Sequence, residues 1–383
     1  MKGVCENDKV QKNAGVGVRV LIAASGTGGH LFPAVDIARA FQKIDEKAEV
    51  MFVGSGRYLE AEIIDKAGFT RSVIDIVGIK QRGLSGLIEF CMKLPSALLQ
   101  GWGIISRFKP DIVIGVGGYV TVIPVVLAWL RGIPTWIHEA ERSPGMANRF
   151  LAHISYRISV AFQDAQVSQR DKVVYTGQPI REVFKEIAAE NKEVDIPRNL
   201  LITGGSQGAN ALDTVAEALI PFFKEKNLNI RHQCRQENLE KLKAAYAENG
   251  VTAEVMDFIQ DLPESYRWSD LIIARAGAGS TMEIGVINRP TIFVPFPFAQ
   301  GNHQLKNAQI LADAGKALIV EEGDEFCNRL EKALADLLTP AIYNKMKAAP
   351  YRSRSLDAAE NIAKGCLKIL KIKKGKFFTS VEN

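Results

Sequence analysis

Two stretches of the chain share one pattern of hydrophobic and polar positions. VRVLIAASGTGGHLFPAVDIARAF covers residues 18–41, and NLLITGGSQGANALDTVAEALIPFF covers residues 199–223. In each, a short apolar run leads into a glycine-rich turn, and apolar residues then recur at helical spacing. This pattern predicts a strand followed by a helix. Because the second stretch repeats the plan of the first, we expect the fold to restart near residue 199 and the chain to form two domains.

Further short apolar runs in each half predict strands that are buried on both faces. They alternate with segments of helical periodicity, which is typical of parallel sheets covered by helices on both sides. We therefore expect an α/β protein with two doubly wound, Rossmann-like domains that face each other across a central cleft. The predicted strands are Val50–Val53, Asp111–Gly115, Thr135–His138, Ile158–Ala161, Ile230–Gln233, Leu271–Ala274 and Thr291–Val294.

A polar stretch sets the predicted boundary between the two domains. Residues 185–198 have weak apolar periodicity and contain Pro197, which is the composition of an interdomain connection. The final helical pattern, in the segment 355–383, is expected to pack back on the amino-terminal domain and to end in a basic tail. The predicted divisions are a loose extension at 1–17, domains at 18–184 and 199–354, the connection at 185–198, and the final segment at 355–383.

Composition excludes several classes of protein. The chain has 383 residues, of which 47% are hydrophobic and 24% charged, with a formal net charge of +5, so it is an ordinary globular sequence. Its five cysteines are scattered, which argues against a disulfide framework or a zinc site and favours a reducing compartment. The start has no apolar region typical of a signal peptide. The longest apolar run, Val120–Leu130, is shorter than the roughly 20 residues of a membrane span.

One segment could attach the protein to a membrane surface. Residues 79–102 mix large apolar side chains with basic ones, a combination that suits apolar insertion plus attraction to anionic lipid. An ordinary amphipathic helix packed on the sheet is the alternative interpretation. The expected membrane contacts are Ile79, Lys80, Arg82, Leu84 and Leu87.

Four glycine-rich turns follow predicted strands and precede helices. They are SGTGGH (25–30), GVGGY (115–119), GGSQG (204–208) and ARAGAGS (274–280). Unpaired N–H groups at such helix starts favour an anion or another polar ligand. Glycines that merely permit tight connections are the alternative for any single turn. Four turns at strand ends favour the ligand.

The turns do not fit the common nucleotide-cofactor patterns. A nicotinamide site needs an acidic residue at the end of the second strand, whereas Val50–Val53 leads into Gly54 and Ser55. Leu31 stands where the last glycine of GxGxxG belongs, and no GxxxxGK[ST] occurs. The remaining option is a nucleotide used as substrate. Glu283 could then bind the ribose diol, and His303 and Gln304 could read sugar hydroxyls, although each also fits a solvated or helix-start role.

At these residues the sequence resembles the MurG family, the UDP-N-acetylglucosamine transferases that complete the lipid-linked disaccharide precursor of peptidoglycan. The resemblance runs from about Val18 to Leu370. It rests on motifs in family order: GTGGHLFPA, KPDIVIGVGGY, IPTWIHE with PGMANR, TGQPIR, ITGGSQGA, ARAGAGSTMEI and NHQLKNA. It implies the GT-B fold, with the lipid-linked acceptor on the amino-terminal domain and UDP-N-acetylglucosamine on the carboxy-terminal domain.

The resemblance also implies roles for individual residues. Ser206, Gln207 and Arg181 would lie near the donor diphosphate, Glu283 would bind the ribose, and Phe258 and Ile259 would frame the uracil. His303 and Gln304 would read the donor sugar, and Gly26, Gly117, Gly118 and Tyr119 would hold the acceptor diphosphate. The complete set implied for the donor is Thr27, Gly28, Gly29, Glu141, Arg181, Ser206, Gln207, Phe258, Ile259, Ser280, Glu283, His303 and Gln304.

One departure from the family pattern concerns the donor sugar. The family usually reads HEQN where this chain has His138, Glu139, Ala140 and Glu141. The family asparagine contacts the donor sugar, and an ionised Glu141 cannot donate a hydrogen bond. PGMANR, which follows, is intact.

The implied reaction is an inverting displacement at the anomeric carbon. His30 is the first candidate for the base that accepts the proton of the acceptor 4-hydroxyl, because it follows a glycine turn and titrates near neutral pH. Glu139 and His138 are the rival candidates. No Asp-x-Asp motif occurs, so we expect no bound metal and no cofactor.

The expected partners are UDP-N-acetylglucosamine, polyprenyl-diphosphate-linked muramyl-pentapeptide, the cytoplasmic membrane surface, and cell-wall or division proteins, but no nucleic acid. Three alternatives remain open from the sequence. The chain could be another GT-B glycolipid glycosyltransferase, a UDP-N-acetylglucosamine epimerase, or a binding module without turnover.

Overall fold

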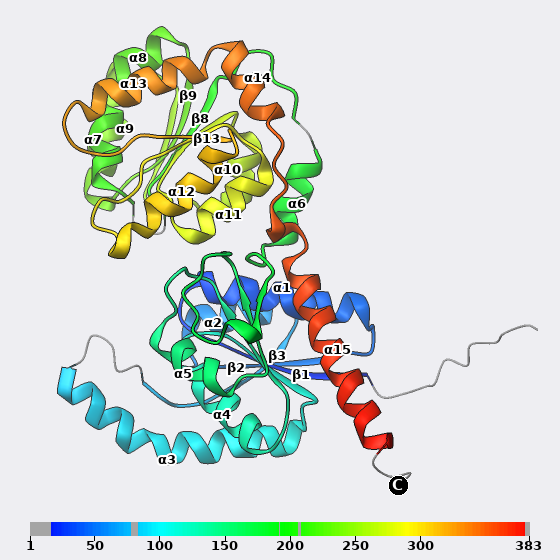
Figure 1. Cartoon of the computed structure of the whole chain (residues 1–383). Helices are drawn as coiled ribbons and strands as arrows, with labels where there is room; N and C mark the ends of the chain where they lie inside the picture. The colour runs from blue at the N-terminus through cyan, green and yellow to red at the C-terminus, as the bar shows by residue number, and fades with distance from the viewer. Residues whose placement is uncertain (1–16, 78–82, 191, 206–207, 380–383) are drawn as a thin grey trace, which may run out of the picture.

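The computed structural model describes residues 17–77, 83–190, 192–205 and 208–379, which form two α/β domains (Figure 1). Each domain is built on one parallel sheet. The amino-terminal sheet has seven strands in the order β3-β2-β1-β4-β5-β6-β7, and the carboxy-terminal sheet has six in the order β10-β9-β8-β11-β12-β13. Strand order reverses between β1 and β4 in one sheet and between β8 and β11 in the other. The doubly wound architecture predicted from the sequence is therefore confirmed.

The amino-terminal sheet is covered by helices on both faces. Alternate residues of β1 enter two different cores: Val20 and Ile22 pack with α1, whereas Leu21 and Ala23 pack with α3 and α4. This burial on both sides explains the continuous apolar run of the strand. The elements are β1 (Arg19–Ala24), α1 (Gly28–Ile44), β2 (Glu49–Gly54), α2 (Tyr58–Lys66), β3 (Thr70–Val73), α3 (Gly83–Phe108), β4 (Ile112–Gly117), α4 (Val122–Leu130), β5 (Thr135–Glu139), α5 (Met146–Ile154), β6 (Arg157–Val160) and β7 (Val173–Tyr175).

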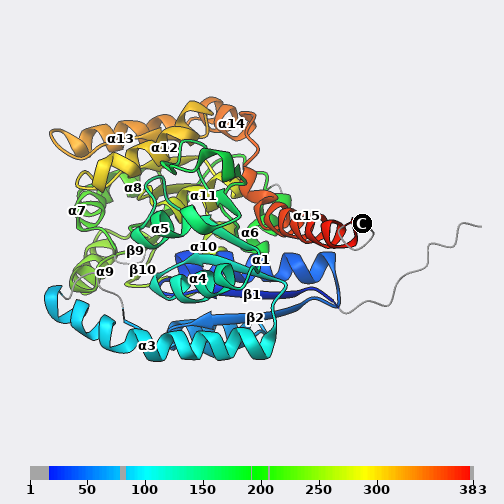
Figure 2. The same ribbon diagram turned by 60° about the horizontal axis from the view of Figure 1, so that its bottom comes forward.

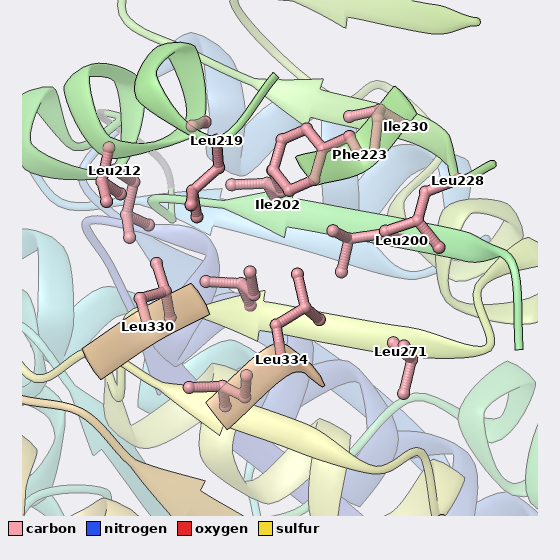
Figure 3. Close-up of a cluster of buried hydrophobic side chains, with 14 of the residues drawn as sticks. Leu200, Ile202, Leu212, Leu219, Phe223, Leu228, Ile230, Leu271, Leu330 and Leu334 are labelled. Carbon is pink, nitrogen blue, oxygen red and sulfur yellow. The ribbon is translucent and has the colours of Figure 1, made fainter. Parts of the chain in front are cut away.

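The carboxy-terminal domain repeats this arrangement. Figure 3 shows one of its cores, in which Leu200 and Ile202 of β8 meet Leu212, Phe223 and Leu334 from the covering helices. The elements are β8 (Asn199–Thr203), α7 (Asn210–Ala218), α8 (Ile220–Glu225), β9 (Asn229–Gln233), α9 (Leu239–Glu248), β10 (Ala253–Met256), α10 (Leu262–Trp268), β11 (Leu271–Ala274), α11 (Ala278–Ile287), β12 (Thr291–Phe293), α12 (His303–Asp313), β13 (Ala317–Ile319), α13 (Phe326–Leu337) and α14 (Pro340–Ala348).

Two helices join the domains. α6 (Glu182–Ala189) buries Phe184 and Ile187 in a core of the carboxy-terminal domain. The predicted connection at 185–198 therefore begins inside a helix, which is a difference from the sequence-based boundary.

The last helix, α15 (Ala358–Thr379), returns to the amino-terminal domain and lies along α1 (Figures 1 and 2). Ile362 and Cys366 join the core of α1, and Lys43 pairs with Glu360 at 2.9 Å. A Cβ on Gly365 would lie 2.6 Å from the Trp136 ring, so α15 approaches β5 closely at a residue without a side chain. The carboxy-terminal helix thus belongs structurally to the amino-terminal domain.

Candidate active site

The four glycine-rich turns occupy the two points where strand order reverses. Turns 25–30 and 115–119 follow the adjacent strands β1 and β4, and turns 204–208 and 274–280 follow the adjacent strands β8 and β11. In doubly wound sheets such switch points form the ligand crevice at the carboxyl ends of the strands. Sequence position alone placed the turns at strand ends, and the topology places them in pairs.

The two turns of the amino-terminal domain touch each other. Ser25 N–H donates to the carbonyl of Gly117 at 3.1 Å. Gly118 has φ 85°, and a Cβ there would lie 2.2 Å from Ser25 Oγ. A Cβ on Gly117 would lie 2.5 Å from the His30 ring. Glycine is therefore required where the second turn packs against the first.

His30 sits between these turns in the form that a general base needs. Its Nδ1 lies 3.2 Å from the carbonyl oxygen of Ser25. A carbonyl only accepts, so Nδ1 carries the proton and Nε2 keeps its lone pair. Burial lowers the pKa of His30 below its ordinary value, although its bond to Ser25 opposes this shift. The imidazole is therefore neutral at physiological pH and able to accept a proton at Nε2.

The geometry argues against His138 as the base. Its side chain is fully buried, Nδ1 pairs with Ser159 Oγ at 2.9 Å, and Nε2 pairs with Gln178 Oε1 at 2.9 Å. Burial lowers its pKa to about 4. Both nitrogens are engaged by neighbours within the amino-terminal domain, and the bond to Ser159 ties β5 to β6.

Glu139 is also engaged by its own domain. Asn148 Nδ2 donates to its Oε2 at 2.8 Å, and the backbone N–H of Glu141 donates to its Oε1 at 2.9 Å. It is 4% exposed, and burial raises its pKa to about 6. These bonds brace the loop between β5 and α5, which makes Glu139 a weaker base candidate than His30.

Glu141 lies within electrostatic range of the carboxy-terminal domain. Burial raises its pKa, and the positive potential of His303 at the start of α12 partly opposes that rise. Glu141 stands where the family has asparagine, and its electrostatic partner His303 is a residue expected to read the donor sugar. A protonated Glu141 would have an O–H to donate, which the ionised form lacks.

Hydrogen bonds from β8 and β9 hold Gly205 in the donor-side glycine turn. Ser206 and Gln207 lie outside the described residues, but Gly205 and Gly208 on either side have φ of 78° and 68°. Gln233, 4% exposed at the end of β9, donates through Nε2 to the carbonyl of Gly205 at 2.5 Å. Thr203 Oγ1 donates to Gln233 Oε1 at 2.7 Å. Sequence reasoning missed this brace, because no motif connects Gln233 to the turn.

Arg181 and Glu283 meet where the domains join. The Arg181 guanidinium lies 3.8 Å from Glu283 Oε1 and stacks on the rings of Phe32 and Phe184 at 4.6 and 4.5 Å. Burial raises the pKa of Glu283 to about 7, against the opposing charge of Arg181. The structure therefore brings together two residues that the sequence assigned to one donor, one from the start of α6 and one from α11.

The remaining donor candidates line the same side of the carboxy-terminal domain. Phe258 is 58% exposed, as suits a ring that frames a base, whereas Ile259 is buried. Gln304 Oε1 accepts a hydrogen bond from Phe296 N at 3.0 Å, so its amide N–H₂ is the end directed to other partners. Ser280 lies in the first turn of α11, next to the ARAGAGS glycines.

The amino-terminal turn has its own brace. Glu60, 1% exposed on α2, accepts from Gly26 N at 3.2 Å and from Ser55 N at 2.7 Å. Thr27, Gly28 and Gly29 open α1, and Tyr119 lies under the Arg57 guanidinium at 5.8 Å. Glu60 belongs to no motif that the sequence analysis recognises, so it is not among the candidate residues.

The segment proposed for membrane contact is mostly helix α3. Ile79, Lys80 and Arg82 lie outside the described residues, and the side chains of Leu84 and Leu87 are not described either. Further along α3, four large apolar side chains are about half exposed or more: Ile88, Met92, Leu99 and Trp102. Trp129 and Leu130 at the end of α4 are exposed as well, and Arg131 stacks on Trp102 at 4.7 Å. We call these six apolar residues the α3–α4 surface.

Neither a spanning helix nor a metal cluster occurs in the part of the chain that the structure describes. No helix there has the length and apolarity to cross a membrane. No group of three or more His, Cys, Asp or Glu side chains there is arranged to hold a metal ion.

Comparisons with known proteins agree on both domains. Family models match residues 20–160 as the glycosyltransferase family 28 N-terminal domain and residues 199–362 as its C-terminal domain. A protein of Syntrophus aciditrophicus named UDP-N-acetylglucosamine–N-acetylmuramyl-(pentapeptide) pyrophosphoryl-undecaprenol N-acetylglucosamine transferase is 36% identical over 359 residues, or 93% of this chain and 99% of the relative. A protein of the same name from Desulfotalea psychrophila is 37% identical and covers 92% of this chain and 97% of its own.

Solved structures are similar over the same length. The crystal structure of MurG from Acinetobacter baumannii matches with a TM-score of 0.70 and 30% identity, over 92% of this chain and 99% of that one. A UDP-GlcNAc 2-epimerase from Neisseria meningitidis, bound to UDP-GlcNAc, matches with a TM-score of 0.67 over 91% of this chain and 99% of that one. At 17% identity the second likeness shows the fold alone.

Proposed function

Because the chain belongs to glycosyltransferase family 28 and to its MurG transferases, we propose that it moves N-acetylglucosamine from UDP-N-acetylglucosamine to the 4-hydroxyl of polyprenyl-diphospho-muramyl-pentapeptide. The product is the lipid-linked disaccharide used in peptidoglycan synthesis. The observation that carries the proposal is the paired arrangement of glycine turns at both switch points of a GT-B fold, with a neutral His30 beside one pair.

The reaction follows from the residues at these turns. His30 Nε2 accepts the proton of the acceptor 4-hydroxyl as its oxygen forms a bond to the anomeric carbon of the donor sugar. The bond from that carbon to the diphosphate oxygen breaks, and UDP leaves with the electron pair. Attack from the side opposite UDP inverts the anomeric configuration. The N–H groups of the 204–208 turn and the charge of Arg181 stabilise the leaving diphosphate.

Donor recognition is divided among elements of the carboxy-terminal domain. Glu283 accepts hydrogen bonds from the ribose hydroxyls, and Phe258 with Ile259 frames the uracil. His303 and Gln304 read the sugar from the first turn of α12. Ser206, Gln207 and Ser280 complete the donor set, with Thr27, Gly28 and Gly29 approaching from the opposite domain. This chemistry uses no bound metal ion, because backbone dipoles and Arg181 meet the diphosphate charge.

The acceptor requires contact with a membrane surface, since its polyprenyl tail stays in the bilayer. The acceptor diphosphate lies on Gly26, Gly117, Gly118 and Tyr119. The α3–α4 surface inserts apolar side chains into the cytoplasmic leaflet, while Arg131 beside Trp102 faces anionic lipid. α3 follows β3 and runs back along the sheet to β4, so Ile88 and Met92 lie nearer the carboxyl edge that carries the acceptor turns, whereas Trp102, Trp129 and Leu130 lie toward the opposite edge.

A radiolabelled-donor assay tests the proposal. Vesicles carrying the lipid-linked muramyl-pentapeptide should yield labelled lipid, and His30→Ala should lower turnover by about 100-fold or more while donor affinity changes little. Vesicles with diacylglycerol serve as the control acceptor. Labelled product from diacylglycerol alone would overturn the proposal in favour of another glycolipid transferase. Conversion of the donor sugar to its 2-epimer without acceptor would favour an epimerase.

A further inference from the structure

Arg142 crosses from one domain to the other. It lies in the loop between β5 and α5 of the amino-terminal domain and is 8% exposed. Its Nε donates to Asn307 Oδ1 at 3.1 Å, and its Nη2 donates to the backbone carbonyl of Lys306 at 3.0 Å. Both partners belong to α12, about 165 residues further along the chain. Three N–H directions of one planar guanidinium are engaged once Asp164, which pairs with Nη1, is included.

Contacts within the amino-terminal domain also hold the Arg142 guanidinium in place. It stacks on the Phe162 ring at 4.5 Å, and Phe162 is buried in a cluster with residues of the carboxy-terminal domain. The backbone carbonyl of Arg142 accepts from Gln166 N at 2.7 Å. A pre-oriented guanidinium loses little side-chain entropy when it forms its cross-domain bonds, so those bonds stabilise the contact more than a flexible surface pair would.

Asn307, the partner of Arg142 on α12, is also held in place by its own domain. Asn307 is fully buried, and its Nδ2 donates to the carbonyl of Ala276 at 3.1 Å. Arg142 therefore connects the β5–α5 loop through Asn307 to the ARAGAGS turn as well as to α12. Breaking the Arg142 bond would leave Asn307 Oδ1 buried without that donor, which is costly for a buried polar atom.

Two neighbouring residues of one loop thus reach the same turn of α12. Glu141 interacts electrostatically with His303, and Arg142 bonds to Lys306 and Asn307. That turn also carries Gln304. On the other side, the loop is braced by Glu139 and Asn148.

We propose that Arg142 is a positioning residue that locks the donor-sugar turn of α12 onto the acceptor domain, so that the sugar carbon and the attacking hydroxyl stay aligned. This inference rests on the proposed function. Arg142 does not touch the reacting atoms: it acts through His303 and Gln304, whose helix it holds. Most of the proposed uridine and diphosphate contacts, from the 204–208 turn, Phe258, Ile259 and Glu283, lie on the carboxy-terminal domain and do not pass through Arg142.

The test compares Arg142→Met with Arg149→Met. Methionine keeps an unbranched apolar stem on Phe162 but has no N–H to donate. Arg149 donates to Pro144 O at 2.9 Å within the amino-terminal domain and serves as the matched control. Loss of a charge-assisted hydrogen bond predicts a fall in kcat/KM for transfer of about 10-fold to 100-fold in Arg142→Met. UDP affinity should change by less than about twofold, and Arg149→Met should keep parental turnover.

Two further variants separate positioning from loss of fold. Arg142→Lys keeps the charge beside Asp164 but cannot reach Asn307 and Lys306 together, so it should restore little of the lost turnover. Asn307→Leu removes the acceptor from the other side. If the two residues act as one unit, the double variant Arg142→Met/Asn307→Leu should be no slower than the slower single variant. Full rescue by lysine, or additive losses, would overturn the assignment.

A distance measurement without acceptor keeps this test independent of the proposed function. Spin labels on the exposed native Cys91 and on Lys224→Cys would report the separation of the domains, in a background with Cys5→Ser and Cys327→Ser. With UDP-N-acetylglucosamine bound, Arg142→Met should broaden the distance distribution and the Arg149→Met control should not. An unchanged distribution together with unchanged kcat/KM would overturn the lock. Absence of product from the parent chain would overturn only the proposed function.

Discussion

Glu283 is the residue whose charge should make donor binding depend on pH. Its pKa is raised to about 7 by burial, and a carboxylate accepts ribose hydroxyls better when ionised. Donor affinity should therefore fall as the pH drops through 7, becoming about tenfold weaker at pH 6 than at pH 8. Titration calorimetry with UDP-N-acetylglucosamine, whose diphosphate diester does not titrate in this range, measures the effect.

The control variant Glu283→Gln should bind the donor more weakly at pH 8 and lose the pH dependence. A glutamine variant with the parental pH profile would exclude Glu283 as its source.

Asp36 makes a separate prediction about stability. It is 7% exposed on α1, its Oδ2 has no hydrogen-bond partner among the described residues, and burial raises its pKa from 3.8 to about 7. Between these values the folded state keeps a proton that the unfolded state has released, so Asp36 lowers stability as the pH rises through this window. Asp36→Asn should raise the free energy of unfolding at pH 8 by up to about 4 kcal/mol and leave it nearly unchanged at pH 4.

Thermal unfolding of Asp36→Asn at a series of pH values checks this sign. Asp195→Asn, which removes an exposed carboxylate, is the control and should shift the Tm little at any pH. A Tm gain for Asp36→Asn that grows toward acid would contradict the prediction.

At the scale of elements, sequence pattern identified the strands that lie inside each sheet. Strands such as β4 and β11 are apolar throughout because both faces are covered, and this signal is local. The four short edge strands β3, β7, β10 and β13 were not identified, since each pairs on one side only and is placed by tertiary contacts. The sequence pattern places most of α6 in the connection, because its apolar face is short. Only the contacts of that face with the carboxy-terminal core identify it as part of a packed helix.

The site shows the same division between local and distant information. The glycine turns could be predicted, since a turn between strand and helix is a local feature. The burial of His138 could not, because its partners Ser159 and Gln178 are 21 and 40 residues away. Arg142 was invisible to sequence reasoning for the same reason, as its partner Asn307 lies in the other domain.

The Gln233 brace gives a prediction at the scale of the β9 strand and the donor turn. Gln233→Leu keeps the side-chain volume but removes the bonds to Gly205 O and Thr203 Oγ1. The turn should then sample conformations that do not fit the diphosphate, so UDP affinity should fall by roughly tenfold while the Tm changes little. Calorimetry with UDP measures the loss. Gln236→Leu, at an exposed site three residues further on, is the control. Parental UDP affinity in Gln233→Leu would show that the turn needs no brace.

At the scale of the whole molecule, we expect the α3–α4 surface to hold the acceptor domain on the bilayer. Leu99 and Trp102 are 74% and 49% exposed. Replacing both with glutamate should remove apolar insertion and add repulsion from anionic lipid, lowering binding to phosphatidylglycerol vesicles by about 100-fold. Turnover with a short-chain, water-soluble acceptor should stay at the parental rate, because the glycine turns are untouched.

The control variant Ile196→Glu, which changes an apolar residue 63% exposed on the connection before β8, should affect neither readout. Equal loss of turnover on both acceptors would mean that α3 supports the fold of the acceptor domain rather than its membrane contact. Parental vesicle binding in the double variant would place the membrane contact elsewhere on the chain.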